Sequence, residues 1–483
     1  MKGNWRKSSF NRCACCSPTL KFLTDRVNAD LSRRGFLAGL TTSLAGLGLP
    51  NLATAQTKGV PAASTRILVL YNLRLFDGLS AGSRDNFSVL VENGKIADIV
   101  SGAVRPPEGA QAIDCGGRTL MPGLIDAHWH AMMATLSLPA LLTSDVGSIH
   151  LAASAEAERT LMRGFTTVRD MAGPTFALKK AIDTGLISGP RIYPSGAIIS
   201  QTGGHGDFRL TYEIPRVGSS LSRTEVLGFS SISDSPDAVR RSAREQLMAG
   251  ATQIKIAAGG GIISLYDPID VNEFRPQEIR AAVEAAEDWG TYVAAHVYRV
   301  EGIRRCVEAG VRCIEHGQLI DKETAQVLAD KDVWWSLQAF LDDEDATQFP
   351  PGSERYEKQR LVTTGTDTSY DLAKTKKIKT AWGTDILFDA KQTPRQGAQL
   401  AKLARWFTPA EVLKQATSIN ADLLRLSGAR NSYSAKLGVI AKGAYADMLL
   451  VDGDPATNIT LIADPEKNFR LIIKEGRIYK NTL

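Results

Sequence analysis

The stretch Leu124-Ile125-Asp126-Ala127-His128-Trp129-His130 decides the fold, because it is an apolar run that ends in two histidines one residue apart. Side chains at positions i and i+2 of a β-strand point to the same side. A strand here would present His128 and His130 together at its carboxyl end, as the first two ligands of a divalent metal ion. Taken alone, the pair could also be one histidine packed in a core and one in solvent. The metal interpretation therefore requires further ligands elsewhere in the chain.

Short apolar runs alternate with Ala-rich helical stretches in the sequence that follows Met121. Strand–helix alternation repeated eight times is the signature of a (β/α)8 TIM barrel, which belongs to the α/β class. The predicted strands are residues 124–128, 165–171, 191–199, 252–257, 291–298, 312–317, 333–340 and 379–388. Two long polar connections, 201–234 and 341–370, are expected to be loops that shape a substrate pocket or only decorate the surface.

The two ends of this barrel segment are flanked by alternating, β-rich sequence. Residues 66–100 alternate apolar and polar side chains around Asn93-Gly94, which is a hairpin signal. Similar β-rich sequence returns from Lys436 to the end of the chain. We predict one small β-sandwich domain built from residues 56–120 and 431–483, beside a barrel domain of residues 121–430.

The first 55 residues have the features of an export signal. Ser32-Arg33-Arg34-Gly35-Phe36-Leu37 resembles the twin-arginine motif, an apolar run extends to Leu49, and Ala53-Thr54-Ala55 is an A-x-A cleavage pattern. The apolar run is too short for a stable membrane span. Residues 1–55 are therefore predicted to be a signal peptide, with the twin-arginine export machinery as a partner and a periplasmic or secreted location.

Charge and cysteine content limit the possible partners. The chain of 483 residues has a formal net charge of +5, but residues 1–55 alone contribute +6, so the remainder is close to −1. No basic surface for nucleic acid is therefore expected. Only Cys115, Cys306 and Cys313 follow the leader, which is not a disulfide framework.

Further metal-ligand types occur at the ends of the later predicted strands. These are Lys255, His296, His316 and Asp385, and with His128 and His130 they include four of the six histidines of the chain. Barrel strands end at one common face. Lys255 lies between Ile254 and Ile256, so strand alternation directs it to the barrel interior, where an unpaired ammonium is costly. The alternatives are a solvated lysine and core histidines held by hydrogen bonds.

This ordered set of residues resembles the amidohydrolase superfamily of metal-dependent hydrolases over nearly the whole chain after the leader. The resemblance implies two divalent metal ions, usually Zn²⁺, with His128, His130 and Asp385 on one ion and His296 and His316 on the other. It implies that Lys255 is N6-carboxylated by CO2 and bridges both ions. A metal hydroxide would then attack the amide carbonyl while Asp385 transfers a proton to the leaving amine. Assembly into homo-oligomers is also common in the family.

Two further residues are candidate substrate contacts. His205 lies in the glycine-rich stretch 203–207, and Tyr298 shares a strand face with His296. Both positions resemble the branch that contains Xaa-Pro and Xaa-Arg dipeptidases, which are carboxypeptidase-like, and ochratoxin amidohydrolases. That branch implies hydrolysis of an amide or peptide bond next to a free carboxylate, in dipeptides or N-acyl amino acids. Met133 replaces a polar residue of those relatives. A helix-capping His205 and a packed Tyr298 are the alternatives.

Other functions remain open at this point. The same fold could support a cyclic-amide hydrolase or a deaminase resembling imidazolonepropionase, but deaminases generally lack the Lys255 equivalent. A non-catalytic scaffold would be expected to have lost ligands, and none is missing. Arg169-Asp170 is interpreted as an internal ion pair that supports the site, and His150 as a surface or helix-cap residue.

Overall fold

The structure is a computed structural model that describes residues 67–216, 218 and 220–483. The predicted signal peptide, residues 1–55, lies outside the described residues, so that prediction stays a prediction. Within the part of the chain that is described, no helix combines the length and the apolar character that a membrane span requires.

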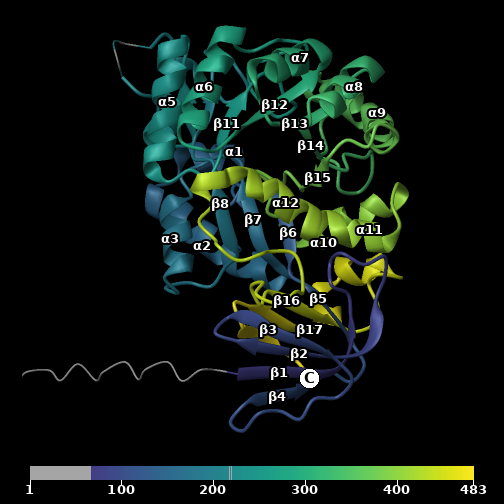
Figure 1. The fold of residues 1–483 in the computed structure, drawn as a ribbon. Coiled ribbons are helices and arrows are strands. Elements are labelled where there is room, and N and C mark those ends of the chain that lie inside the picture. Colours follow the sequence, from purple (N-terminus) through teal and green to yellow (C-terminus); the bar gives the residue numbers. More distant parts are fainter. Residues whose placement is uncertain (1–66, 217, 219) are drawn as a thin grey trace, which may run out of the picture. The chain divides into compact units, whose positions relative to one another are not determined.

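Parallel strands with helices between them form the larger part of the described chain (Figure 1). One sheet has the order β6 (Leu124–Trp129), β7 (Phe165–Asp170) and β8 (Arg191–Pro194). The other has the order β10 (Ser230–Ile232), β9 (Ile198–Ser200), β11 (Ile254–Ala257), β12 (Val293–Arg299), β13 (Cys313–Leu319), β14 (Trp334–Leu337) and β15 (Thr380–Trp382). The α/β prediction is confirmed, and every predicted strand segment contains a strand.

The third predicted strand, residues 191–199, is divided into two pieces. β8 pairs with β7, whereas β9 pairs with β11, so the segment passes from one sheet to the other. The break falls at Gly196, whose φ of +74° favours glycine. β10 pairs with β9 and lies inside residues 201–234, so the prediction that this whole segment is a loop was wrong there.

The first and last strands of the series are joined by side chains and loop backbone. The Asp385 amide donates to the His128 carbonyl (2.8 Å), and the Thr384 hydroxyl donates to Asp126 (2.7 Å). The described residues contain no ladder of strand pairs between β6 and β15. The strand order agrees with a barrel, and its full closure stays a prediction.

Amphipathic helices cover the outer faces of these strands. Their buried sides pack on the sheets, as Val239, Ala243 and Leu247 of α5 do in the main core. The helices between strands are α1 (Leu138–Thr143), α2 (Val146–Met162), α3 (Phe176–Asp183), α4 (Arg223–Val226), α5 (Pro236–Ala249), α6 (Pro276–Asp288), α7 (Val300–Ala309), α8 (Lys322–Asp330) and α9 (Glu354–Thr375).

The connection 341–370 is shorter than the sequence predicted. α9 begins at Glu354, and the Ser353 side chain caps it by accepting the Tyr356 amide hydrogen bond. The helix is polar overall, but Val362, Thr366 and Tyr370 share a buried face at a spacing of four residues. That narrow stripe explains why a largely polar sequence is helical here.

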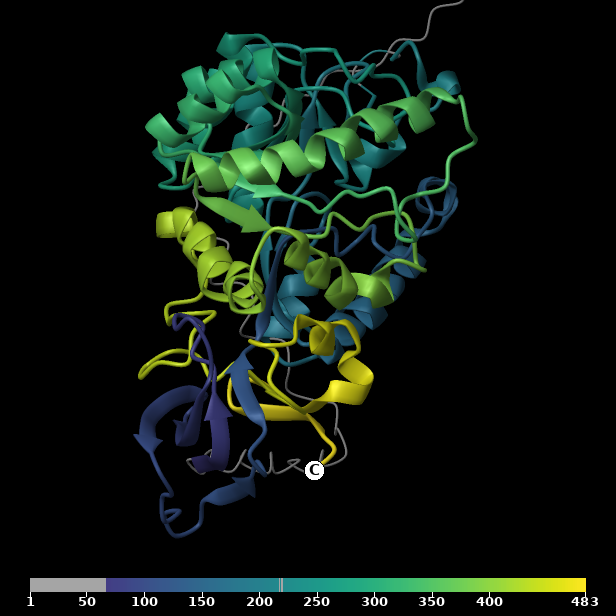
Figure 2. The same ribbon diagram turned by 90° about the vertical axis from the view of Figure 1, so that its right-hand side faces the viewer.

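A separate eight-stranded sheet joins the two ends of the described chain. Its order is β18 (Arg477–Asn481), β17 (Phe469–Lys474), β16 (Met448–Val451), β5 (Thr119–Pro122), β1 (Ile67–Leu75), β2 (Arg84–Glu92) and β3 (Lys95–Ser101), and β4 (Gln111–Asp114) also pairs with β1. One forked sheet thus unites both chain ends, and the division into β-sandwich and barrel domains stays a prediction. Three short helices, α10 (Gln396–Ala401), α11 (Pro409–Lys414) and α12 (Asn420–Leu424), lie between this sheet and the parallel strands in both views (Figures 1 and 2). The remaining helix, α13 (Pro465–Asn468), precedes β17.

The sheet from the chain ends packs tightly against the parallel strands. Leu449 and Phe469 of that sheet belong to the same buried core cluster as Leu124 and Phe165. A Cβ at Gly164, just before β7, would lie 2.5 Å from the Phe469 ring and 2.9 Å from Leu449. This junction therefore has no room for one more methyl group.

We predict that Gly164→Ala destabilises the protein more than Gly185→Ala, by about 1–3 kcal/mol, the usual effect of overpacking. Both glycines have positive φ, +87° and +73°, but a Cβ at Gly185 would meet nothing within 4 Å. Because both substitutions place an alanine at a positive φ, the difference between their free energies of unfolding measures the crowding at Gly164. Urea unfolding of both variants measures it, and equal losses would show that the junction is loosely packed.

Candidate metal centre and active site

Five of the six histidines form a continuous arc of imidazole rings. Successive ring centroids are 5.3 Å apart for His130 and His128, 4.9 Å for His128 and His316, 4.6 Å for His316 and His296, and 3.7 Å for His296 and His205. His128 and His130 come from the carboxyl end of β6, His296 and His316 from the middle of β12 and β13, and His205 from the loop after β9. His150 lies apart, within α2 and not at its cap, which is Asp145.

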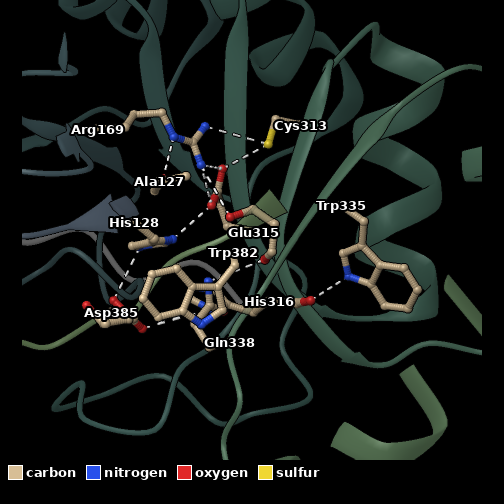
Figure 3. A network of polar contacts seen from close by, with 12 residues as sticks. Ala127, His128, Arg169, Cys313, Glu315, His316, Trp335, Gln338, Trp382 and Asp385 are labelled. Carbon is tan, nitrogen blue, oxygen red and sulfur yellow. Dashed lines mark hydrogen bonds and ion pairs between the residues drawn. The ribbon is translucent and has the colours of Figure 1, made fainter. Parts of the chain in front are cut away.

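A buried ion pair lies behind the His128 ring of this arc (Figure 3). His128 Nδ1 is 2.8 Å from a Glu315 carboxylate oxygen, and Arg169 donates to the same carboxylate at 2.7 and 2.8 Å. Burial alone would raise the pKa of Glu315, but the Arg169 charge holds it well below its usual range. Glu315 is therefore a carboxylate that accepts Nδ1–H and leaves His128 Nε2 as the nitrogen toward the pocket.

The interpretation of Arg169-Asp170 as an ion pair was wrong. Adjacent residues of β7 point to opposite sides, so Arg169 reaches Glu315 whereas Asp170 accepts the Ala131 amide hydrogen bond at 2.7 Å. Burial raises the pKa of Asp170 well above its ordinary value. Asp170 thus holds the segment that follows His130, and Arg169 neutralises Glu315.

Asp385 faces three of the imidazoles. One carboxylate oxygen is 2.9 Å from His130 Nε2 and 3.3 Å from His128 Nε2, and the other is 3.9 Å from His316 Nδ1. Burial would raise the pKa of Asp385, but the neighbouring histidines outweigh it and hold the pKa well below the usual range. Asp385 is thus a strong anionic oxygen donor at the centre of the arc.

Two of the clustered residues have unusual backbone conformations. His316 and Asp385 have φ of 72° and 57°, in the left-handed region that costs non-glycine residues about 1–3 kcal/mol. The Trp335 indole donates a hydrogen bond to the His316 carbonyl (2.6 Å), and the Asp385 amide donates one to the His128 carbonyl. These bonds hold both side chains toward the pocket.

Lys255 is buried in the same pocket with a relative exposure of 2%. The nearest acidic groups, Glu315 and Asp385, pair with Arg169 and His130 instead. Burial is the main cause that lowers the pKa of Lys255 to about 8. A substantial share of the amine is therefore neutral at mildly alkaline pH.

The donor set fits a divalent ion of the zinc type. One ligand atom each of His128, His316 and Asp385 lie within 4.8 Å of one another. Burial lowers the pKa of His128 to about 4 and those of His296 and His316 well below their ordinary value, so these imidazoles are neutral and free to ligate. His130 Nδ1 is buried without a hydrogen-bond partner among the described residues, and His296 Nε2 contacts only the Gly260 carbonyl at 3.2 Å.

His205 and Tyr298 line the same pocket as all six predicted metal ligands. The His205 ring stacks on His296 with an interplanar angle of 6°. Tyr298 meets His296 edge-on at 5.2 Å and stacks on His316 at 5.2 Å. Its hydroxyl is neutral, because burial raises its pKa well above the ordinary value. The structure thus brings all eight predicted site residues to one cavity.

Part of the pocket wall is apolar. It belongs to one buried cluster that packs behind His128 and His130 and continues to the loop after β15. The cluster members that line the pocket are Met133, Ala172, Ile198, Phe208, Ile386 and Leu387. An apolar substituent of a bound molecule would be desolvated there.

Sequence reasoning missed four buried acidic residues that support the site. All four are almost completely buried, and each makes a hydrogen bond or ion pair with a site residue or with a neighbour of one. They are Asp126, Asp267, Glu273 and Glu315. The one available signal was a charged residue inside an apolar strand, as Glu315 is in β13. Their partners, up to 270 residues away in sequence, become visible only in the fold.

Comparison with known proteins agrees with this geometry. Residues 119–478 match the amidohydrolase family. Ochratoxinase from Aspergillus niger is 28% identical over 445 residues, which cover 88% of this chain and 90% of that protein. Among solved structures, an amidohydrolase is similar with a TM-score of 0.78 and 36% identity, and a prolidase complexed with N-methylphosphonate-L-proline with 0.77 and 33%. Each covers 86% of this chain and 100% of the solved chain.

The chain therefore belongs to the amidohydrolase family, as the resemblance predicted. It is a hydrolase that acts on carbon–nitrogen bonds of the amide or peptide type. The family generally binds divalent metals, in agreement with the cluster of His128, His316 and Asp385.

We predict that Arg169→Met destabilises the protein by about 3–5 kcal/mol, because it leaves the Glu315 carboxylate buried and unpaired. The double variant Arg169→Met/Glu315→Gln should recover part of that loss, since the uncompensated charge is gone. Denaturant unfolding of the single and double variants measures the coupling. Strictly additive losses would contradict the ion pair as the main interaction of Arg169.

Proposed function

We propose that this protein is a metal-dependent amidohydrolase that cleaves an amide or peptide bond next to a free carboxylate. The observation that carries the proposal is the placement of His205 and Tyr298 beside His296, in the cavity that also holds the candidate metal ligands. Dipeptides and N-acyl amino acids, including ochratoxin-like amides, have the required chemistry.

The proposed metal site would hold two divalent ions, for which the family resemblance indicates Zn²⁺. His128, His130 and Asp385 would hold one ion and His296 and His316 the other, with carboxylated Lys255 between them. In the carboxylation, the neutral Lys255 amine adds to CO2, an N–C bond forms and a proton is released. When bound, such ions supply Lewis acidity and lower the pKa of water.

Asp385 is the proposed proton carrier of the reaction. Its anionic carboxylate lies against three imidazoles, so it can accept a proton from water and return it to the leaving amine. The Glu315–Arg169 pair fixes the His128 ring during this transfer.

The substrate is proposed to lie across the imidazole arc. Its free carboxylate is bound by His205 and Tyr298, and an apolar group on the other side meets Met133, Phe208 and Ile386. The ligand in the similar prolidase structure, a phosphonate of proline, and the name of the similar ochratoxinase support a substrate that combines a carboxylate with a bulky group.

Broader features of the protein belong to the same proposal. We infer a closed eight-stranded barrel, a β-sandwich domain from both chain ends, export through the twin-arginine pathway and a homo-oligomeric assembly. The strand order and the shared sheet support the first two. The last two rest on the motif at residues 32–37 and on the family resemblance.

We predict that Lys255→Ala loses most bound metal and at least about 100-fold in kcat/KM, because the bridging ligand is gone. Lys474→Ala is the matched control, since Lys474 is also buried but lies in β17, outside the pocket. Metal content by mass spectrometry and turnover check both variants. An active, metal-replete Lys255→Ala would contradict the bridging role.

We predict that zinc-loaded protein releases free amino acids from N-acyl amino acids and dipeptides, with apolar acyl groups preferred. Mass spectrometry of a substrate panel reads the products, and chelation followed by zinc titration should restore activity at two ions per chain. Ammonia release with one ion per chain would favour a deaminase instead. No turnover at all would support the alternative that the protein is a non-catalytic scaffold.

A further inference from the structure

Asp267 is a buried carboxylate that faces His205 from the segment between β11 and α6. We propose that Asp267 is a positioning residue, which orients the His205 ring so that its Nε2 meets the carboxylate of the substrate. The proposal rests on the proposed function, because it takes His205 as a substrate contact.

His205 is the one ion-pair partner of the Asp267 carboxylate among the described residues. An Asp267 carboxylate oxygen lies 3.6 Å from His205 Nδ1 and accepts the Gly261 amide hydrogen bond at 2.6 Å. The other carboxylate oxygen and His205 Nδ1 are both buried, and neither has a hydrogen-bond partner in the described chain. A carboxylate with a relative exposure of 1% is costly without a charge partner, and the oxygen that accepts the Gly261 amide hydrogen bond is also the one that faces His205 Nδ1.

The surroundings of the His205 ring allow one orientation. One face stacks on His296 with centroids 3.7 Å apart. The Nδ1–Cε1 edge lies against Gly261, where a Cβ would come within 2.1 and 2.2 Å of these atoms. The side chain is 21% exposed, and with Nδ1 buried the ring nitrogen left for the cavity is Nε2.

The backbone around both residues is fixed from three elements. Glu273 accepts the His205 amide hydrogen bond at 2.7 Å, and its other oxygen contacts the Ser200 hydroxyl at 3.3 Å. Lys358 of α9 donates to the Asp267 carbonyl at 2.7 Å. Asp267 and His205 therefore face one another as parts of a rigid frame, and not as two loop residues that meet by chance.

The pairing has a direct chemical consequence for an anionic substrate. A histidine that donates Nδ1–H to a carboxylate has a fixed ring orientation, set by that second partner. With Nδ1 directed at Asp267, the ring presents Nε2 to the cavity, where it can contact the substrate carboxylate.

The test is Asp267→Asn, which keeps the size of the side chain. We expect KM for the best N-acyl amino acid to rise about tenfold while kcat changes less than twofold. In a His205→Ala background the same substitution should have no further effect, because the two residues act through one contact. Asp447→Asn, a buried carboxylate paired with Arg191, is the control and should leave KM unchanged.

A second readout does not depend on turnover. Nitrogen-15 NMR of the histidine rings, with His205→Ala used to assign the signal, should show a His205 Nδ1 signal that shifts in Asp267→Asn. An unchanged ring signal, or losses that add to those of His205→Ala, would overturn the proposal. If the wild-type protein hydrolyses no N-acyl amino acid or dipeptide, the proposed function fails, and the ring signal still decides whether Asp267 orients His205.

Discussion

The buried ion pair between Arg169 and Glu315 is the interaction on which the site depends. Both side chains are fully buried, and Glu315 in turn holds His128. Both charges are removed from water, so either one alone would be an uncompensated buried charge. The pair fixes one imidazole from behind, and that ring sets the position of Asp385 and His316 beside it. The geometry of the pocket therefore begins with a contact that no substrate touches.

The residues around the pocket combine rigid supports with strained backbone. His316 and Asp385 occupy left-handed conformations, and their neighbours Trp335 and His128 hold them there by hydrogen bonds. At the other end of the arc, Asp267 faces the His205 ring, and Glu273 accepts the hydrogen bond of the His205 amide. Side chains that meet ligands are thus set by partners from other strands. This arrangement keeps the donors in place before any ligand arrives.

The sequence predicted the parts of the fold and site that depend on local pattern. His128 and His130 follow from alternation in one strand, and Lys255 from its two isoleucine neighbours. The α/β class and the family were confirmed, whereas the roles of the six ligands stay predictions. The sequence analysis missed the bend at Gly196 and the start of α9 at Glu354, and it assigned the wrong partner to Arg169. Each depends on contacts with residues distant in sequence, which periodicity does not encode.

The sheet shared by both chain ends determines when the pocket can form during synthesis. β5 runs through Gly123 directly into β6, the strand that carries His128, and it pairs with β16 near the end of the chain. The Gly123 amide also donates to the Asp447 carbonyl at 2.9 Å. The base of the first site strand therefore gains this support only once residues 447–451 have been synthesised. A chain without these residues would keep the pairing of β6 with β7 but lose the contacts that hold its start.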